Sequence, residues 1–150
     1  MRFDFYSLSR WSLEDAIPRI LDKIIEKDNR ALILTSSEEE AEELCESLWS
    51  TSINKWLGHG TIKDGNPLDQ RVFITNEIGN ANKSNVLILT DFFYDEKIFS
   101  YERCISIFSR DNSQAINFSQ EISNKKNGCS VELHFWRQKS DGKWIEEISL

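Results

Sequence analysis

The fold is decided by the stretch Ala31-Leu32-Ile33-Leu34-Thr35-Ser36-Ser37-Glu38-Glu39-Glu40-Ala41-Glu42-Glu43-Leu44-Cys45-Glu46-Ser47-Leu48-Trp49. Its first four residues form a continuous apolar run, which is typical of a strand buried on both faces of a parallel sheet. Ser36 or Ser37 then caps a helix whose first-turn glutamates suit the positive end of the helix dipole. A buried strand followed at once by an amphipathic helix indicates an α/β fold.

The alternation of strand and helix continues in both directions along the chain. Apolar residues at helical spacing after Ser12 predict a helix, with Pro18 inside it or near its first turn. Further patterns predict strands over 3–8, 72–75, 86–89 and 104–108, a helix from about 111 to 126, and a final hairpin of 130–137 with 143–148. We therefore predict one domain over residues 1–150, a three-layer αβα sandwich with a mostly parallel, Rossmann-like sheet and an antiparallel edge.

Bulk composition fits a single globular domain, with 39% hydrophobic and 29% charged residues among 150. No apolar stretch approaches the roughly 18–20 residues of a membrane span. Asp4 interrupts the only candidate for the apolar segment of a signal peptide. The three cysteines are widely spaced, as expected of a reducing compartment. We expect a cytoplasmic protein with no membrane contact, no metal and no cofactor.

The formal net charge of −7 argues against broad, non-specific binding of nucleic acid, which requires a basic face. Residues 103–143 nevertheless contain seven Lys and Arg against four Asp and Glu. This region either attracts an acidic peptide or carries ordinary solvated surface charge.

The sequence contains none of the familiar motifs of nucleotide binding or nucleophilic catalysis. There is no phosphate-binding glycine motif after a predicted strand, and no nucleophile elbow accompanies the two histidines, His59 and His134. We therefore favour a binding protein over an enzyme. Two alternatives are a degenerate helicase-like or nucleotide-binding α/β domain, and a small-molecule enzyme that uses His59 with a nearby carboxylate.

Two tryptophans mark a candidate contact surface. Trp49 and Trp56 lie seven residues apart where the predicted helix gives way to a loop, and His59 follows closely. The residues around Trp56 are small and polar, which is typical of irregular surface structure. Exposed tryptophans are frequent anchors of protein interfaces. The equal alternative is that one or both fill the core from a loop.

Several segments, in their order and spacing, resemble the chi subunit family of the bacterial DNA polymerase III holoenzyme. They span nearly the whole chain: Phe5-Tyr6-x-Leu8, Arg30-Ala31-Leu32-Ile33-Leu34, Trp56-Leu57-Gly58-His59-Gly60, Arg103-Cys104-Ile105-Ser106-Ile107-Phe108 and Trp136-Arg137-Gln138-Lys139-Ser140-Asp141-Gly142-Lys143-Trp144.

The resemblance implies a non-catalytic accessory subunit of the clamp loader that reaches DNA only indirectly. One surface would bind the psi subunit or, in some bacteria, a helicase, through Trp49, Trp56, Leu57 and His59. A second surface would hold the acidic, phenylalanine-ended C-terminal tail of single-stranded DNA-binding protein (SSB). Its expected residues are Arg110, Phe118, Ile122, Lys125 and Lys126, and Arg103 and Arg137 are further cations that neighbouring elements could supply.

Overall fold

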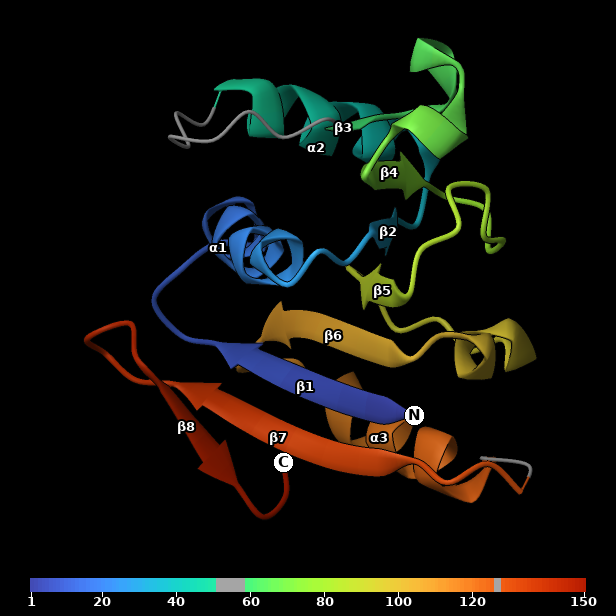
Figure 1. The fold of residues 1–150 in the computed structure, drawn as a ribbon. Helices are drawn as coiled ribbons and strands as arrows, with labels where there is room; N and C mark the ends of the chain where they lie inside the picture. Colours follow the sequence, from blue (N-terminus) through green and yellow to red (C-terminus); the bar gives the residue numbers. More distant parts are fainter. Residues whose placement is uncertain (51–58, 126–127) are drawn as a thin grey trace.

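A computed structural model describes residues 1–50, 59–125 and 128–150. Its strands form one sheet in the order β3-β4-β2-β5-β6-β1-β7-β8 (Figure 1). Every neighbouring pair is parallel except β7 and β8, which are antiparallel at one edge. The strands are β1 Arg2–Leu8, β2 Ala31–Leu34, β3 His59–Gly60, β4 Val72–Thr75, β5 Val86–Leu89, β6 Arg103–Ser109, β7 Glu132–Gln138 and β8 Trp144–Glu147.

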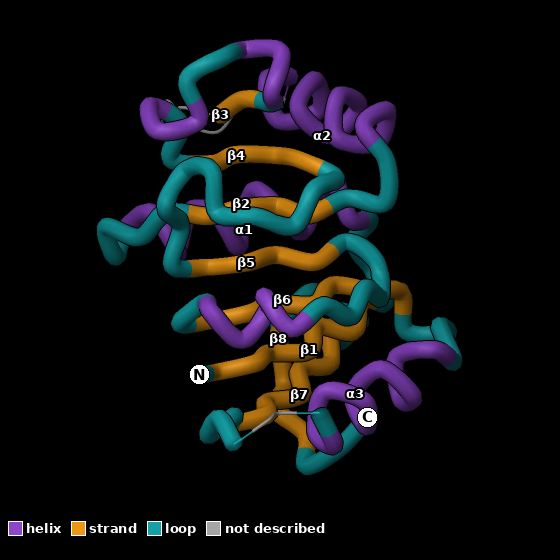
Figure 2. Tube along the Cα trace, turned by 90° about the vertical axis from the view of Figure 1, so that its right-hand side faces the viewer, coloured by secondary structure: helices purple, strands orange, loops and turns teal. Residues whose placement is uncertain are grey.

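Helices cover both faces of this sheet. The helices α1 (Leu13–Glu26) and α2 (Glu38–Ser50) pack on one face, and α3 (Gln114–Asn124) packs on the other. Figure 2 views the sheet face-on, with α1 behind it and α3 in front. Short 3₁₀ helices occupy Ile62–Asp64, Pro67–Asp69 and Glu96–Ser100. The predicted three-layer αβα sandwich with a mostly parallel sheet is confirmed.

The first helix begins where the sequence predicts. Ser12 accepts a hydrogen bond from the backbone of Asp15, whose carboxylate accepts one from Ser12 in return. Pro18 lies inside the helix and is buried. Because proline has no N–H, the carbonyl of Glu14 lacks its usual intrahelical partner there.

The predicted hairpin at the end of the chain is also confirmed. Gly142 adopts a φ of +86°, a conformation that favours glycine, and donates to the carbonyl of Lys139. A Cβ at this position would also lie 3.1 Å from the ring of Trp11. The turn therefore requires glycine for both its backbone conformation and its packing.

The short strand β3 was not predicted. His59 and Gly60 pair in parallel with Val72 and Phe73 of β4, whereas the sequence around them contains mainly loop-forming residues. Two residues are too few to show an apolar period, so only the pairing with β4 identifies them as a strand.

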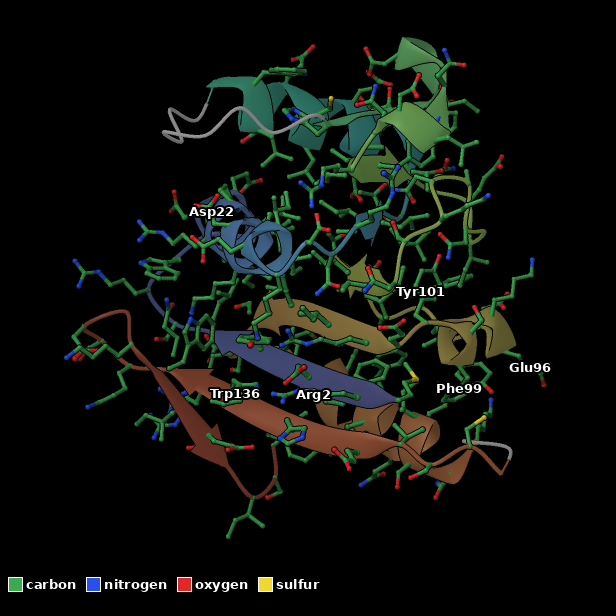
Figure 3. All side chains as sticks on the ribbon, viewed as in Figure 1. Arg2, Asp22, Glu96, Phe99, Tyr101 and Trp136 are labelled. Carbon is green, nitrogen blue, oxygen red and sulfur yellow. The ribbon has the colours of Figure 1, made fainter. Side chains whose placement is uncertain are left out.

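A buried carboxylate joins β1, β6 and β7. Asp4 is 0% exposed and accepts hydrogen bonds from Arg2 at 2.7 Å, from Arg103 Nε at 2.7 Å and from Trp136 Nε1 at 2.8 Å. Figure 3 labels two of these partners, Arg2 on β1 and Trp136 on β7. Burial alone would raise the pKa of this carboxyl, but the hydrogen bond from Arg2 and the charge of Arg103 outweigh it. The pKa of Asp4 therefore lies below its ordinary value, and the carboxylate is charged at neutral pH.

Candidate functional site

The first candidate site is centred on Trp49, in the last turn of α2. Its side chain is 54% exposed, and its ring lies 4.0 Å from the ring of His59, centroid to centroid. His59 is only 4% exposed, and its Nε2 lies 3.3 Å from the carbonyl oxygen of Cys45. A large aromatic surface is thus supported from beneath by a buried ring that is itself held by α2.

Contacts after β3 fix this arrangement. The Thr61 hydroxyl donates to Glu42 of α2 at 2.6 Å, and Asp64 accepts from the Thr61 backbone at 2.8 Å. A Cβ on Gly60 would approach Asp64 to 2.9 Å. Glycine at position 60 therefore leaves the space that the Asp64 side chain occupies beside the backbone.

The thiol beside this site is unsuited to nucleophilic chemistry. Burial and the charge of Asp64, opposed by a hydrogen bond from Trp49, together raise the pKa of Cys45 to about 11. Cys45 is therefore a protonated thiol at neutral pH, and not the thiolate that nucleophilic attack requires. His59, the proposed base of the enzyme alternative, has almost no solvent-exposed surface through which to reach a substrate.

Of the four residues predicted to bind psi or a helicase, the structure brings Trp49 and His59 together. Trp56 and Leu57 lie outside the described residues. Their roles stay predictions.

The second candidate region surrounds α3, and two of its predicted residues belong to the core. Phe118 and Ile122 lie on the inner side of the helix, and the Phe118 ring centroid is 6.2 Å from those of both Phe3 and Phe5. Residues four apart share one helix face, and this face packs on the sheet. These side chains support the helix from below and present almost no area to a partner.

The two predicted cations that the structure describes, Arg110 and Lys125, do not lie together. Arg110 precedes α3 and Lys125 follows it, so an eleven-residue helix of about 16 Å separates them. Lys125 forms a 2.6 Å ion pair with Glu121 and lies 4.3 Å from the ring centroid of Tyr94. Lys126 lies outside the described residues.

A cavity of about 350 Å³ lies at the Arg110 end of α3. Its apolar walls include Phe108, Phe135 and Leu150, which come from β6, β7 and the segment after β8. None of these three was predicted as a site residue, because only the fold brings them together. The sequence did point to one residue of this cavity. Arg137, noted above as a further cation, also lines it.

Within residues 1–50, 59–125 and 128–150, no three His, Cys, Asp or Glu side chains gather as metal ligands. None of the helices described has the length and apolar character needed to cross a membrane.

Comparison with known proteins identifies the family. The family described as DNA polymerase III chi subunit, HolC, matches residues 1–122. The chain belongs to this chi subunit family. It is 29% identical over 109 residues to the probable DNA polymerase III subunit chi of Rickettsia prowazekii (strain Madrid E). That match covers 73% of this chain and 66% of the relative, slightly under two thirds of the relative's length.

Among solved structures, this chi-family chain is similar to the C-terminal domain of a Dbp5 variant from S. cerevisiae, solved bound to a Gle1 variant and IP6. The TM-score is 0.56 at 11% identity, and the match covers 87% of this chain and 88% of the other. At this identity the likeness concerns the fold alone, and it carries no argument for the helicase-like or nucleotide-binding alternative.

Proposed function

We propose that this chain is a non-catalytic accessory subunit of DNA polymerase III that links the clamp loader to SSB through two separate protein contacts. Membership of the chi family supports this proposal. The structural observation that carries it is the half-exposed Trp49, whose ring lies 4.0 Å from that of the buried His59. Such a subunit works in the cytoplasm and reaches DNA only through its partners.

The first contact is with the psi subunit or a helicase. An exposed indole contributes a large apolar area at a small entropic cost, and tryptophan is enriched among the residues that dominate interface energies. Because His59 and Cys45 fix the orientation of Trp49 before binding, little further ordering is needed on association. Trp56 and Leu57 are proposed to extend this surface.

The second contact is with the SSB tail, on the basic region around α3. An acidic peptide that ends in phenylalanine requires an apolar pocket beside cations that can pair with carboxylates. The structure has cations at both ends of α3, Arg110 and Lys125.

The Trp49 surface is tested by measuring the affinity of purified psi subunit, or of the replicative helicase, for a Trp49→Ala variant. We expect a loss of about 30-fold or more, because truncating an anchor residue costs roughly 2 kcal/mol. Leu68→Ala is the matched control, because Leu68 is an equally exposed apolar side chain, 55% against 54%, on a different segment. Equal binding by both variants would refute this surface.

The SSB contact is tested by calorimetric titration with a synthetic SSB tail peptide at low and moderate salt. We expect micromolar binding that weakens with salt and disappears when the terminal phenylalanine is replaced. Absence of binding at both salt concentrations would refute this half of the proposal.

A further inference from the structure

The helix that carries Trp49 is strongly acidic, and its own stability accounts for only part of that charge. α2 contains six glutamates and no Lys or Arg. The glutamates of its first turn, Glu38, Glu39 and Glu40, suit the positive end of the helix dipole. Glu46 lies in the second half of the helix, where the dipole disfavours a negative charge and the last turn has no basic residue. The helix dipole therefore gives no reason for a carboxylate at position 46.

Glu46 adjoins the exposed ring of Trp49. Residues three apart share a helix face, with about 5–6 Å between their Cβ atoms. A long side chain in a helix leans toward the N-terminus and covers the preceding turn. The hydrogen bond from Trp49 to the thiol of Cys45 holds the indole in this direction. The carboxylate of Glu46 is exposed and makes no hydrogen bond or ion pair with any residue that the structure describes.

Arginine is the side chain whose chemistry matches both groups. The ring contact with His59 occupies one side of the Trp49 indole, and 54% of Trp49 remains exposed. A guanidinium group is a planar cation that stacks on aromatic faces and pairs with a carboxylate through two parallel hydrogen bonds. A lysine ammonium group supplies the charge without this planar geometry.

We propose that the partner bound at the Trp49 surface contributes an arginine, which stacks on Trp49 and pairs with the carboxylate of Glu46. The inference rests on the proposed psi or helicase contact and specifies the chemistry of the partner at that site. The other glutamates of α2 add a negative field that attracts a basic segment. The same field repels acidic segments, so it disfavours binding of the acidic SSB tail at this surface.

Glu42, which shares this helix face with Trp49, is already engaged within the chain. It accepts a hydrogen bond from the Thr61 hydroxyl at 2.6 Å, and its carboxylate lies 3.8 Å from Nζ of Lys63. These contacts join α2 to the segment after β3. Glu42 therefore supports the site from within, whereas Glu46 is available to a partner.

The role of Glu46 is tested by measuring the affinity of the purified psi subunit, or of the replicative helicase, for Glu46→Gln. Glu43→Gln is the matched control, because it removes the same charge from an exposed residue of the same helix, about 9 Å along the axis from Trp49. We expect Glu46→Gln to bind about tenfold or more weakly, since the arginine loses a charge-assisted pair. Glu43→Gln should bind within about twofold of the unmodified chain. Equal affinities of the two variants would overturn the role of Glu46.

Melting temperatures separate binding from folding in this test. A carboxylate in the second half of α2 opposes the helix dipole, so Glu46→Gln should melt at the same temperature as the unmodified chain or higher. A lower melting temperature together with weaker binding would make Glu46 a structural residue and would overturn the proposal.

The arginine is tested with a double-mutant cycle. Each arginine of the partner is replaced singly by alanine, and each variant is titrated into the unmodified chain and into Glu46→Gln. For one of these arginines, we expect the loss of affinity to be at least about threefold smaller with Glu46→Gln, because its carboxylate partner is already absent. If no arginine shows this coupling, the proposed pairing is wrong.

The outcomes also distinguish this inference from the proposed function. If Trp49→Ala weakens partner binding and Glu46→Gln does not, the Trp49 surface stands and this inference fails. If Trp49→Ala binds the partner as well as the unmodified chain does, the proposed contact is refuted, and this inference with it.

Discussion

Replacing the buried Asp4 by asparagine tests the physical account of how three strands are held together. Asp4→Asn keeps the size of the side chain and one acceptor oxygen, but it removes the charge. It also places an amide donor among the donors of Arg2, Arg103 and Trp136. At least one of these contacts must then break, because two donors cannot share a hydrogen bond.

The magnitude follows from burial and from the number of hydrogen bonds. Each hydrogen bond to a charged group contributes about 1.5–3 kcal/mol, and breaking a fully buried ion pair costs about 3–5 kcal/mol. Asp4 is fully buried, but Arg2 and Arg103 have side chains that are 41% and 28% exposed and regain hydration. We therefore expect Asp4→Asn to lower the free energy of unfolding by about 3 kcal/mol.

Urea unfolding at pH 7, followed by tryptophan fluorescence, measures this loss. For a chain of this size, a loss of that magnitude lowers the melting temperature by roughly 6–12 °C. Asp69→Asn is the matched control, because it makes the same chemical change at an exposed position and should stay within about 0.5 kcal/mol of the unmodified chain. If Asp4→Asn is no more destabilising than this control, the network does not stabilise the fold as argued.

The contribution of Asp4 to the free energy of unfolding should depend on pH in a definite direction. The folded state lowers the pKa of Asp4, so its stabilising contribution is fully present above the unfolded value of about 3.9. This contribution is lost as the pH falls through the lower folded value. The difference in unfolding free energy between the unmodified chain and Asp4→Asn should therefore narrow below about pH 4. A difference that stays constant down to pH 2 would contradict this assignment.

Two further predictions concern the Trp49 site and the thiols. Gly60→Ala should destabilise the fold by about 1–2 kcal/mol, because its Cβ would meet Asp64 at 2.9 Å, whereas Gly79→Ala, with open space around its Cβ, should not. Equal melting temperatures of the two variants would refute the close approach of Asp64 to Gly60. Iodoacetamide at pH 8 should label the exposed Cys129 much faster than Cys45, whose buried thiol has a pKa of about 11. Equal labelling rates of the two cysteines, measured by mass spectrometry, would refute the conclusion that burial and a raised pKa protect Cys45.

The sequence predicts most of the fold because its central strands are uninterrupted apolar runs. Residues 31–34 and 86–89 are both fully buried strands, as their composition indicates. The spacing of Phe118 and Ile122 likewise predicts the inward face of α3. Their assignment to tail binding came from family resemblance, and it conflicts with that same spacing.

The candidate sites were harder to predict, because they depend on contacts between distant segments. Trp49 was identified from its place at a helix end, but its ring contact with His59 requires β3, which no local pattern indicates. The cavity depends on Phe108, Phe135 and Leu150 meeting at one end of α3. Hydrophobic periodicity reports on residues that are close along the chain. It does not indicate which distant segments come into contact in the folded protein.

The position of β1 between β6 and β7 has a consequence for the order in which a newly made chain folds. β1 is synthesised first, but two hydrogen-bond partners of Asp4 are made much later. Arg103 follows it by 99 residues and Trp136 by 132 residues. At about 5–20 residues per second, 132 residues take the ribosome roughly 7–26 s. For the first 99 residues of that interval β1 has neither of its neighbouring strands, and it lacks β7 until the end. Nascent chains of this protein should therefore depend on chaperones until β7 has emerged.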